Sequence, residues 1–482
     1  MRLFAGIAMG LAFAWLIESH ADGERGSGIR KEGPKYQPYV AGFLLPIFLL
    51  ILYVIGRLFW GRDYTNRAIL SMCFTLFLHI GVYDSILLLL LPYLRRRINA
   101  RACAVLWMIP NYMYLIMQNT MSLPAPLFYI DIPGKLAWYL LGIWFVGFVI
   151  VLILKIGAHF WFRKQLLNRA EPAELAMRQQ WKLALADARF RNQDIPLMAS
   201  AHITTPVAVG LLLDTTVVVL PKKDYTSEEL ELIFLHEIVH IGRQDPWNKF
   251  FLVFCTAMCW FNPLMWIAME KSAEDLELSC DETVLLDADD EVRKQYAGLL
   301  LSTAGDARGF TTCLSASAEA LRYRLKNIVK PLDRSTGAVV VGAAFLLLSL
   351  TYGVVAIGYD GVSGSEVLYQ SDNHTRYTMT VLSSELPLSE AELELADGDG
   401  ILEYLSGLTM YRIAGQYSFN GIDHGALLEI SAPHTPDCWI YVRNQTIEVY
   451  YFNQPNLEPI FYHIPQGIDW GYLNRLIDGT SK

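Results

Sequence analysis

A His-Glu-x-x-His pattern is the group of residues in this sequence whose types and spacing point most clearly to chemistry. His236 and His240 are four residues apart, so on a helix they lie on one face and can bind one zinc ion. Glu237 follows the first histidine and can accept a proton from a water molecule that the metal polarises. Residues Thr226–Glu229 could cap the start of this helix. The pattern therefore predicts a helix that carries a hydrolytic zinc centre.

A catalytic zinc ion needs a third protein ligand, and the sequence offers more than one carboxylate for that role. The stretch Trp247–Trp266 is strongly apolar, and Asn262-Pro263 should break it into two helices. On the second helix Glu277 and Asp281 are four residues apart, so a ligand at 277 could be supported by a carboxylate one turn later. By spacing alone, Glu274 competes with Glu277 as the third ligand.

The composition places this centre in a membrane protein with soluble parts. Of the 482 residues 53% are hydrophobic and 18% charged, and the mean hydropathy is +0.28, whereas an average soluble domain carries about 25% charged residues. This composition excludes disordered, collagen-like and small disulfide-stapled proteins. The net charge of −9 argues against direct binding of nucleic acid, because neutralising phosphates requires a basic surface.

Apolar runs account for the high hydropathy, and several are about long enough to span a bilayer. Ala68–Leu94 is the longest, and Ala104–Met117 is shorter and needs its flanks. Leu3–Ile17 could be a signal-like segment, and we favour a retained span. The six runs are Leu3–Ile17, Tyr39–Gly56, Ala68–Leu94, Ala104–Met117, Leu136–Leu154 and Gly337–Ile357.

Basic residues between the runs predict the orientation of the chain. Arg95–Arg97 together with Arg101 form the densest basic turn, which should face the cytoplasm. The chain then exits, returns and places the zinc pattern in the cytoplasm. The topology of the first 67 residues is left open, because Arg57, Arg62 and Arg67 would lie outside. The predicted parts are an apolar extension (1–67), a three-span region (68–157), a cytoplasmic metallopeptidase domain (158–335), a transmembrane helix (336–358) and an extracytoplasmic domain (359–482).

The last part of the chain differs in charge from the rest. From Asp360 onward it has 5 basic and 17 acidic residues, a net charge of 5 − 17 = −12, so the remainder carries −9 + 12 = +3. Arg376–Leu382 and Cys438–Phe452 alternate and are rich in strand-forming residues, whereas Ser389–Leu405 resembles an interrupted helix. We expect a small α+β domain here. The fold class predicted for the chain is a multi-pass α-helical membrane protein with a mainly-α zincin-like cytoplasmic domain.

The order of these features resembles the bacterial antirepressor membrane metallopeptidases, a family that includes β-lactam-sensing signal transducers. The resemblance covers about residues 68–358. It rests on the Arg-rich turn, the zinc pattern, Trp-Phe-Asn-Pro-Leu, Glu-Leu-Ser-Cys-Asp-Glu and a late span before an outer domain. The matching stretches are Leu90–Arg101, Thr205–Pro221, His236–Asp245, Trp260–Trp266, Glu277–Leu285 and Leu321–Val329.

Several roles follow from the resemblance rather than from spacing. It implies that His236, His240 and Glu277 bind zinc and that Glu237 is the general base. Further residues match positions that support the metal ligands or a strand on which an extended substrate lies. The supporting residues are Asp281, Asp245 and Arg243, and the substrate strand is Val217, Val218 and Val219.

The sequence also departs from the family. Residues 1–67 add an apolar extension. A penicillin-binding sensor acylates the serine of a Ser-x-x-Lys motif, but after Asp360 the only lysine is Lys482, and Gly479 stands three residues before it. Covalent sensing of β-lactams by residues 360–482 is therefore excluded.

The leading hypothesis is a zinc endopeptidase of the bacterial cell membrane, multi-pass, with its zinc domain in the cytoplasm and residues 360–482 outside. The resemblance implies a cytoplasmic protein substrate, with a helix-turn-helix repressor as the target, and an extracytoplasmic ligand that the sequence does not identify. One alternative is a housekeeping membrane zinc peptidase for quality control or processing. A second is a non-catalytic membrane receptor with a structural zinc, although such a receptor has no use for Glu237.

Overall fold

The computed structural model describes most of the chain and divides it into two compact units. Unit 1 consists of Met1–Ile51, Phe77–Met117 and Val146–Leu350, and unit 2 of Leu52–Leu76, Gln118–Phe145 and Thr351–Lys482. The described residues are 2–31, 42–59, 61–116, 123–133, 135–188, 194–211, 213–286, 288–303, 318–332, 334–368, 376–383, 392–395, 400–413, 417–418, 424–432, 435–451 and 459–480.

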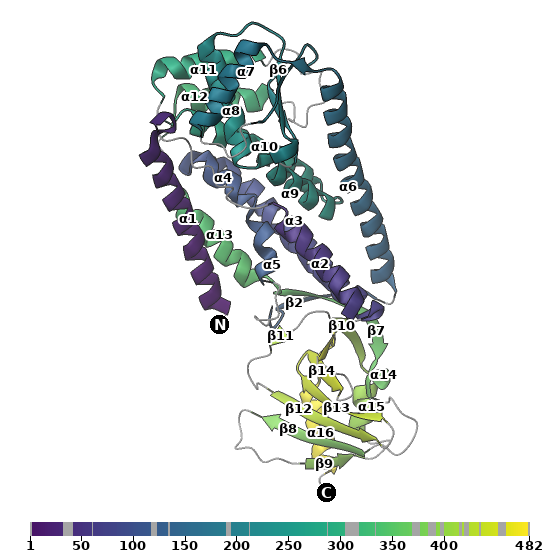
Figure 1. Cartoon of the computed structure of the whole chain (residues 1–482). Coiled ribbons are helices and arrows are strands. Elements are labelled where there is room, and N and C mark those ends of the chain that lie inside the picture. The colour runs from purple at the N-terminus through teal and green to yellow at the C-terminus, as the bar shows by residue number, and fades with distance from the viewer. Residues whose placement is uncertain are drawn as a thin grey trace. The chain divides into compact units, whose positions relative to one another are not determined.

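Helices dominate the first 350 residues (Figure 1). Those before the zinc pattern are α1 (Arg2–Lys31), α2 (Leu44–Phe59), α3 (Arg62–Arg97), α4 (Ala100–Leu106), α5 (Met113–Ile116), α6 (Leu136–Asn168) and α7 (Leu175–Asp187). The pattern and its surroundings form α8 (Ser227–Gly242), α9 (Asp245–Met258), α10 (Pro263–Val284), α11 (Asp290–Thr303), α12 (Ala318–Val329) and α13 (Ala338–Thr351).

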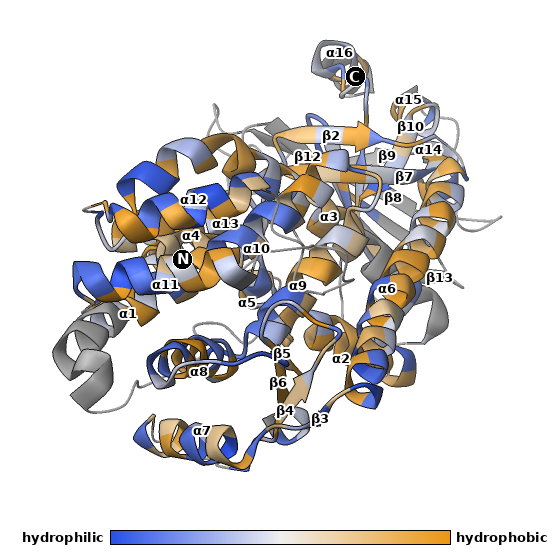
Figure 2. Ribbon diagram, turned by 90° about the horizontal axis from the view of Figure 1, so that it is seen from above, coloured by the Kyte–Doolittle hydropathy of each residue, from blue (hydrophilic) through white to orange (hydrophobic). Residues whose placement is uncertain are grey.

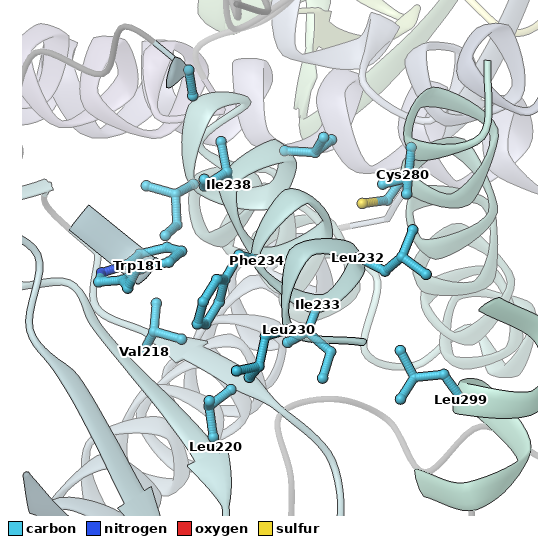
Figure 3. Packing of buried hydrophobic residues seen from close by; sticks show 14 of the residues in the cluster. Trp181, Val218, Leu220, Leu230, Leu232, Ile233, Phe234, Ile238, Cys280 and Leu299 are labelled. Atoms are coloured by element: carbon cyan, nitrogen blue, oxygen red, sulfur yellow. The ribbon is translucent and has the colours of Figure 1, made fainter. Parts of the chain in front are cut away.

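A four-stranded sheet lies beside α8 in unit 1. Its order is β3-β4-β6-β5, with β3 (Glu171–Pro172), β4 (Leu197–Ser200), β6 (Val217–Pro221) and β5 (Val207–Val209). The apolar face of α8 packs on this sheet and on α7, because Leu230, Phe234 and Ile238 join Trp181, Val218 and Leu220 in one buried cluster (Figure 3). This packing fixes the helix that carries the two histidines.

The strand that we expected to receive a substrate is not at the edge of this sheet. Val217–Val219 belong to β6, which pairs with β4 in parallel on one side and with β5 in antiparallel on the other. Because the backbone groups of an inner strand are already engaged in two ladders, Val217, Val218 and Val219 cannot add a further extended peptide. Hydrophobic runs predict a buried strand but do not distinguish its place in the sheet.

Residues of the basic turn are built into the support of α10. Arg95 at the end of α3 donates to Asp275 at 2.7 Å and to Glu274 at 3.2 Å, and the indole N–H of Trp107 donates to the other oxygen of Asp275 at 2.8 Å. Asp275 is fully buried, and a buried carboxylate needs such partners to remain charged. These bonds fix the position of α10 against α3 and the end of α4.

In the part of the chain that the structure describes, two helices are long and apolar enough to cross a membrane, Met72–Arg97 and Leu136–Asn168. Shorter apolar helices cover Gly6–Ser19, Leu44–Phe59 and Ala338–Thr351. Figure 2 shows that α6 is hydrophobic over most of its length and hydrophilic where it leads to β3. Only 6% of the most apolar stretch of α6 is buried inside the protein, whereas the core helix of a soluble protein is mostly buried.

Two expected helices differ from the sequence prediction. The run Ala104–Met117 is not one helix, because α4 ends at Leu106 and a 3-10 helix containing Pro110 precedes the short α5. The helix expected at 336–358 ends at Thr351, and its last residues belong to a strand. Pro110 interrupts the helix expected at 104–117. The helix expected at 336–358 is shorter because the residues from Val355 onward pair as a strand with β2 and β10.

Helices α1 and α13 lie side by side in unit 1 (Figure 1). A side chain at Gly10 would meet the carbonyl oxygen of Gly342 at 2.9 Å, and one at Gly342 would meet that of Gly10 at 2.7 Å. Such close backbone approach requires small residues, as in many pairs of membrane helices. The first apolar run is therefore packed against the last one rather than standing apart from the fold.

Unit 2 is built on a nine-stranded sheet of order β2-β7-β10-β15-β14-β13-β12-β8-β9. It contains more sheet than the small α+β domain we expected. The strands are β2 (Phe128–Asp131), β7 (Val355–Ser363), β8 (Arg376–Ser383), β9 (Glu392–Leu395), β10 (Thr409–Ile413), β12 (His424–Ala432), β13 (Thr435–Arg443), β14 (Thr446–Tyr451) and β15 (Ile460–His463). A separate pair joins β1 (Leu123–Pro124) and β11 (Tyr417–Ser418), and the helices are α14 (Gly364–Leu368), α15 (Gly400–Ser406) and α16 (Trp470–Thr480).

One strand of this sheet comes from the loop between two apolar runs. Strand β2 pairs in parallel with β7, Asp131 opposite Gly358. The carboxylate of Asp131 also accepts a hydrogen bond from Nδ1 of His463 at 2.8 Å. Since strands of one sheet share one compartment, residues 128–131 and the acidic C-terminal part lie on the same side of any membrane that the chain crosses.

Candidate metal centre

The zinc-pattern helix begins with the capping arrangement that the sequence predicts. The side chain of Thr226 accepts from the backbone N–H of Glu229 at 3.2 Å, and the carboxylate of Glu229 accepts from the backbone N–H of Thr226 at 3.0 Å. These two bonds satisfy donors that a helix start leaves free. The prediction of the cap is confirmed, and α8 continues through both histidines.

The two histidines converge through the same ring atom. Nε2 of His236 lies 3.1 Å from Nε2 of His240. On the far side of each ring, Nδ1 is engaged as a donor: that of His240 lies 2.6 Å from the carboxylate of Asp245, and that of His236 lies 2.8 Å from the hydroxyl of Tyr296. Because each Nδ1 carries its proton toward a partner, the Nε2 lone pairs are the ones available to a metal.

The carboxylate of Glu277 completes this group. Its Oε2 lies 3.7 Å from Nε2 of His236 and 3.6 Å from Nε2 of His240. A tetrahedral zinc ion with nitrogen and oxygen ligands at about 2.0–2.2 Å keeps its ligand atoms about 3.3–3.6 Å apart. The three atoms are thus spaced close to what such an ion requires.

Glu274, the competing carboxylate, points to other partners. It accepts from Arg95 and from Lys271, the latter at 2.8 Å. Glu274 and Glu277 are three residues apart on one helix, yet only Glu277 lies among the histidine nitrogens. The spacing of the residues left this choice open, and the ion pairs of Glu274 decide against it.

Cys280 is a donor that the sequence analysis did not consider. Its sulfur lies 3.3 Å from Nδ1 of His236, and the two histidines with Cys280 form a cluster of possible metal ligands. Figure 3 shows Cys280 of α10 with its sulfur toward α8. The thiol contacts Nδ1 of His236, where Tyr296 also lies, and its sulfur and one ring nitrogen of each histidine lie within 4.8 Å of one another, so Cys280 is a second candidate for the third ligand. The sequence could have indicated Cys280 as a candidate ligand, because a residue three positions after Glu277 lies on the same face of a helix.

A chain of buried polar groups supports the ligands. Tyr296 of α11 donates to Asp281 at 2.7 Å, so its oxygen can accept from His236. Arg324 of α12 donates twice to Asp281, both bonds at 2.7 Å, and lies 3.4 Å from Oε2 of Glu277. Asp281 is 1% exposed. Arg324 therefore holds the carboxylate of Glu277 and the partner of Tyr296 in one place.

The turn after α8 brings Asp245 back to the second histidine. Gln244 adopts the left-handed conformation with φ 54°, and α9 begins at the next residue. Oδ1 of Asp245 accepts from Asn248 at 3.1 Å while Oδ2 accepts from His240. A left-handed residue reverses the chain sharply between two helices, which is why a residue five positions after His240 can contact it.

Arg243, unlike Asp245, contacts helix α10 rather than a histidine of the metal centre. It is buried, and it donates to the hydroxyl of Ser279 at 2.9 Å and to that of Thr283. Both hydroxyls belong to α10. The described contacts of Arg243 therefore join the end of α8 to the helix that carries Glu277 through two neutral hydroxyl groups.

The charges of the centre shift the pKa values of its members. Burial lowers the pKa of His236, but Cys280 and Glu277 outweigh burial and raise it to about 10. Burial raises the pKa of Glu277, but His240 and Lys249 outweigh burial and hold it well below its usual range. Without a metal these shifts favour a protonated His236 beside an anionic Glu277, so a divalent cation that binds here would displace the proton of the imidazole.

Glu237 is 5% exposed and lies on α8 directly after the first histidine. The sequence analysis predicted the histidines, Glu237, Glu277, Asp281 and Asp245 as site residues, and the structure brings the ligands and both aspartates together. Tyr296 and Arg324 were missed. Arg324 lies within a stretch that resembles the family, which was its only signal.

Replacing Arg324 with glutamine should lower the zinc affinity of the protein about 10–100-fold, the range for partners that orient metal ligands. The physical reason is that Asp281 and Glu277 lose the guanidinium that fixes them. Arg322, which is exposed on the same helix, gives a matched control in Arg322→Gln. Competition with a fluorescent chelator measures the affinities. Equal affinity in the two variants would contradict the role of Arg324.

The middle part of the chain is similar to known metallopeptidases. The family described as BlaR1 peptidase M56 matches residues 125–328, which contain the four-stranded sheet and α6 to α11. Regulatory protein BlaR1 of Bacillus licheniformis is 25% identical over 232 residues, 46% of this chain and 37% of that protein. Methicillin resistance mecR1 protein of Staphylococcus aureus is 28% identical over 157 residues, 32% of this chain and 26% of that protein. The matched region therefore spans little more than a third of the first relative's length.

Proposed function

We propose that this chain is a membrane-embedded zinc endopeptidase of a signalling system, in keeping with the match of residues 125–328 to the family described as BlaR1 peptidase M56. The observation that carries the proposal is the convergence of two histidine Nε2 atoms and the carboxylate of Glu277, with an acidic residue directly after the first histidine. A structural zinc site with four protein ligands would need no such base.

His236, His240 and Glu277 would hold the metal, with Asp245, Tyr296 and Arg324 fixing their orientation. When bound, zinc lowers the pKa of a water molecule toward about 7 and polarises a carbonyl group. Glu237 accepts the proton of the attacking water and delivers it to the leaving amine nitrogen. The same carboxylate thus acts first as a base and then, protonated, as an acid. These roles amount to hydrolysis of a peptide bond.

Strand β5 provides the free edge on which an extended substrate can pair. It pairs with β6 on one side and is the last strand of the sheet in the part of the chain that the structure describes. Val207 and Val209 point into the core, so only the backbone of β5 and Ala208 are available. Backbone pairing gives affinity with little dependence on sequence. We assign substrate pairing to Val207–Val209 in place of Val217–Val219.

The chain crosses the membrane several times in this proposal, with α3 and α6 as the longest spans. The Arg-rich end of α3 contacts α10, which supports a cytoplasmic position for the metal centre. The pairing of β2 with β7 supports a common outer location for residues 128–131 and the acidic part after Asp360. Helix α13 would connect the outer sheet to the cytoplasmic domain.

Signalling enters the proposal through the relatives, one of which is named a regulatory protein. The outer unit would bind an extracytoplasmic ligand, and the cytoplasmic centre would cleave a protein, with a helix-turn-helix repressor as the target that the resemblance implies. Residues 360–482 contain no Ser-x-x-Lys motif, so in this proposal they would not bind a β-lactam covalently.

A comparison of newly formed protein N-termini in cells tests this function. We expect fragments of one or a few cytoplasmic proteins, a DNA-binding repressor among them, that form under envelope stress in the wild type and are absent from the Glu237→Gln variant. Mass spectrometry of labelled N-termini measures them. Many fragments independent of stress would instead favour a housekeeping peptidase, and no fragment dependent on Glu237 would contradict peptidase activity.

A further inference from the structure

The helices α9 and α10 form a hairpin whose apolar tip the metal centre does not explain. The 19 residues from Phe251 to Met269 contain no Asp, Glu, Lys or Arg. They comprise the last 8 residues of α9, the turn and the first 7 residues of α10. Each arm is therefore uncharged over about 11–12 Å from the turn, at 1.5 Å per residue. This depth is close to one leaflet of a hydrocarbon core of about 30 Å.

Large apolar side chains at this tip lie on the surface rather than in the core. Phe261 is 51% exposed, Ile267 44% and Leu264 40%, and Trp266 is also exposed. These side chains adjoin one another on the turn and the first turns of α10. A cluster of this kind in water is unfavourable and marks a surface that contacts a partner or lipid.

Several backbone groups of the turn are paired within the protein. The N–H of Asn262 donates to the carbonyl of Cys259 at 2.8 Å, and the side chain of Asn262 accepts from the N–H of Leu264 at 3.0 Å. Pro263 has no N–H, and the indole of Trp266 donates to the carbonyl of Trp260 at 3.1 Å. A turn at membrane depth must meet this condition, because the bilayer core offers no hydrogen-bond partners.

The tip lies against both long apolar helices. Phe261 contacts Phe77 of α3 edge-to-face at 5.6 Å, and the thiol of Cys259 donates to the carbonyl of Phe77 at 3.3 Å. On α6, a side chain at Gly147 would meet the ring of Trp260 at 2.2 Å, so this glycine permits close packing. Both helices also carry exposed large apolar side chains, among them Ile86 of α3 and Val146 of α6.

The direction of the hairpin follows from α3. Phe77 precedes Arg95 by 18 residues, which is about 27 Å along a helix. Arg95 is paired with Asp275 near the other end of α10. The hairpin therefore runs beside α3 from its basic end into the apolar part.

We propose that the α9–α10 hairpin is a re-entrant membrane anchor, with the acyl chains of the bilayer as its partner. The inference rests on the proposed function only in taking α3 and α6 as membrane spans. Its consequence is that Glu277, 14 residues after Pro263, lies about 21 Å along α10 from the turn. The metal centre is thereby held at the cytoplasmic membrane surface, and the substrate is cleaved there.

Thiol labelling in inverted membrane vesicles tests the anchor. The Phe261→Cys variant is compared with Lys222→Cys, whose side chain is 59% exposed on the metal domain, after subtraction of the labelling of wild-type cysteines. We expect a membrane-impermeant maleimide to react at least tenfold more slowly with the first variant, and both to react fully after denaturation. Equal rates in native vesicles would overturn the proposal.

Burial inside the protein would also slow the maleimide, so a second measurement reports contact with lipid. A fluorophore on Phe261→Cys in nanodiscs should be quenched by lipids that carry a nitroxide on the acyl chain, and the same fluorophore on Lys222→Cys should not. Slow labelling without this quenching would overturn insertion into the bilayer.

Two glycine substitutions on α6, one near the tip and one away from it, test the packing of the tip on this helix. Gly147→Leu should expose the cysteine of the Phe261→Cys variant to the maleimide, because leucine collides with Trp260. Gly157→Leu should not, since nothing lies within 4 Å of a side chain at that position. Unchanged protection in both would contradict the docking. None of these measurements uses peptidase activity, so failure of the anchor and failure of the enzymatic assignment are distinguishable.

Discussion

Replacing Glu237 with glutamine should abolish measurable peptide-bond cleavage while the protein retains its zinc. Glutamine has nearly the size of glutamate but cannot accept a proton at neutral pH, and positioned acid–base groups contribute about 10²–10⁴-fold to rates. Glu237 is not among the atoms that converge on the metal position, which are Nε2 of His236, Nε2 of His240 and Oε2 of Glu277. Rate and metal content should therefore separate in this variant.

The measurement uses full-length protein in nanodiscs, with release of peptides from labelled casein as the rate and elemental analysis as the zinc content. Glu231→Gln is the matched control, because Glu231 is exposed on the same helix and six residues away. Its rate should equal that of the wild type. A Glu237→Gln protein that cleaves at the wild-type rate would show that another group is the base, and loss of zinc would show that Glu237 supports the metal.

The part of the site that local sequence determines was predictable. A helix with histidines four residues apart needs only the helical period, and Thr226 with Glu229 marks its start. Asn262 and Pro263 likewise predict where α9 and α10 separate, and the structure confirms the break. In each case the residues that form the feature are neighbours in the chain.

The parts of the site and the fold that the sequence did not predict depend on contacts between residues far apart in the chain. Arg324 meets Asp281 from a helix 43 residues further on, and Tyr296 meets His236 from 60 residues away. No spacing rule relates these positions. The pairing of β2 with β7 joins residues more than 200 positions apart, so a loop between apolar runs could not be assigned to the outer sheet. For β6, a buried valine run indicated a strand but not whether it had one neighbour or two.

The second large effect that we expect is a loss of zinc affinity when the third ligand, Glu277, is replaced. We expect Glu277→Gln to lower zinc affinity by about 10²-fold or more, since a zinc site worth about 10–16 kcal/mol divides into about 3 kcal/mol per ligand. Glu274→Gln is the matched control on the same helix. Its carboxylate pairs with Arg95 and Lys271, so its zinc affinity should stay near that of the wild type.

Cys280→Ser distinguishes the two donor sets that the structure permits. If zinc takes Nε2 of both histidines and Glu277, the thiol is a neighbour of His236 at 3.3 Å from Nδ1, and serine should change the affinity by less than tenfold. If zinc instead takes Cys280 together with the two histidines, Cys280→Ser would lower the zinc affinity more than Glu277→Gln does. Chelator competition on the three variants measures this order. Thiolate and carboxylate ligands also give cobalt different absorption spectra. If Glu277 is the third ligand, cobalt-substituted wild-type protein should lack the intense near-ultraviolet band that a thiolate ligand produces.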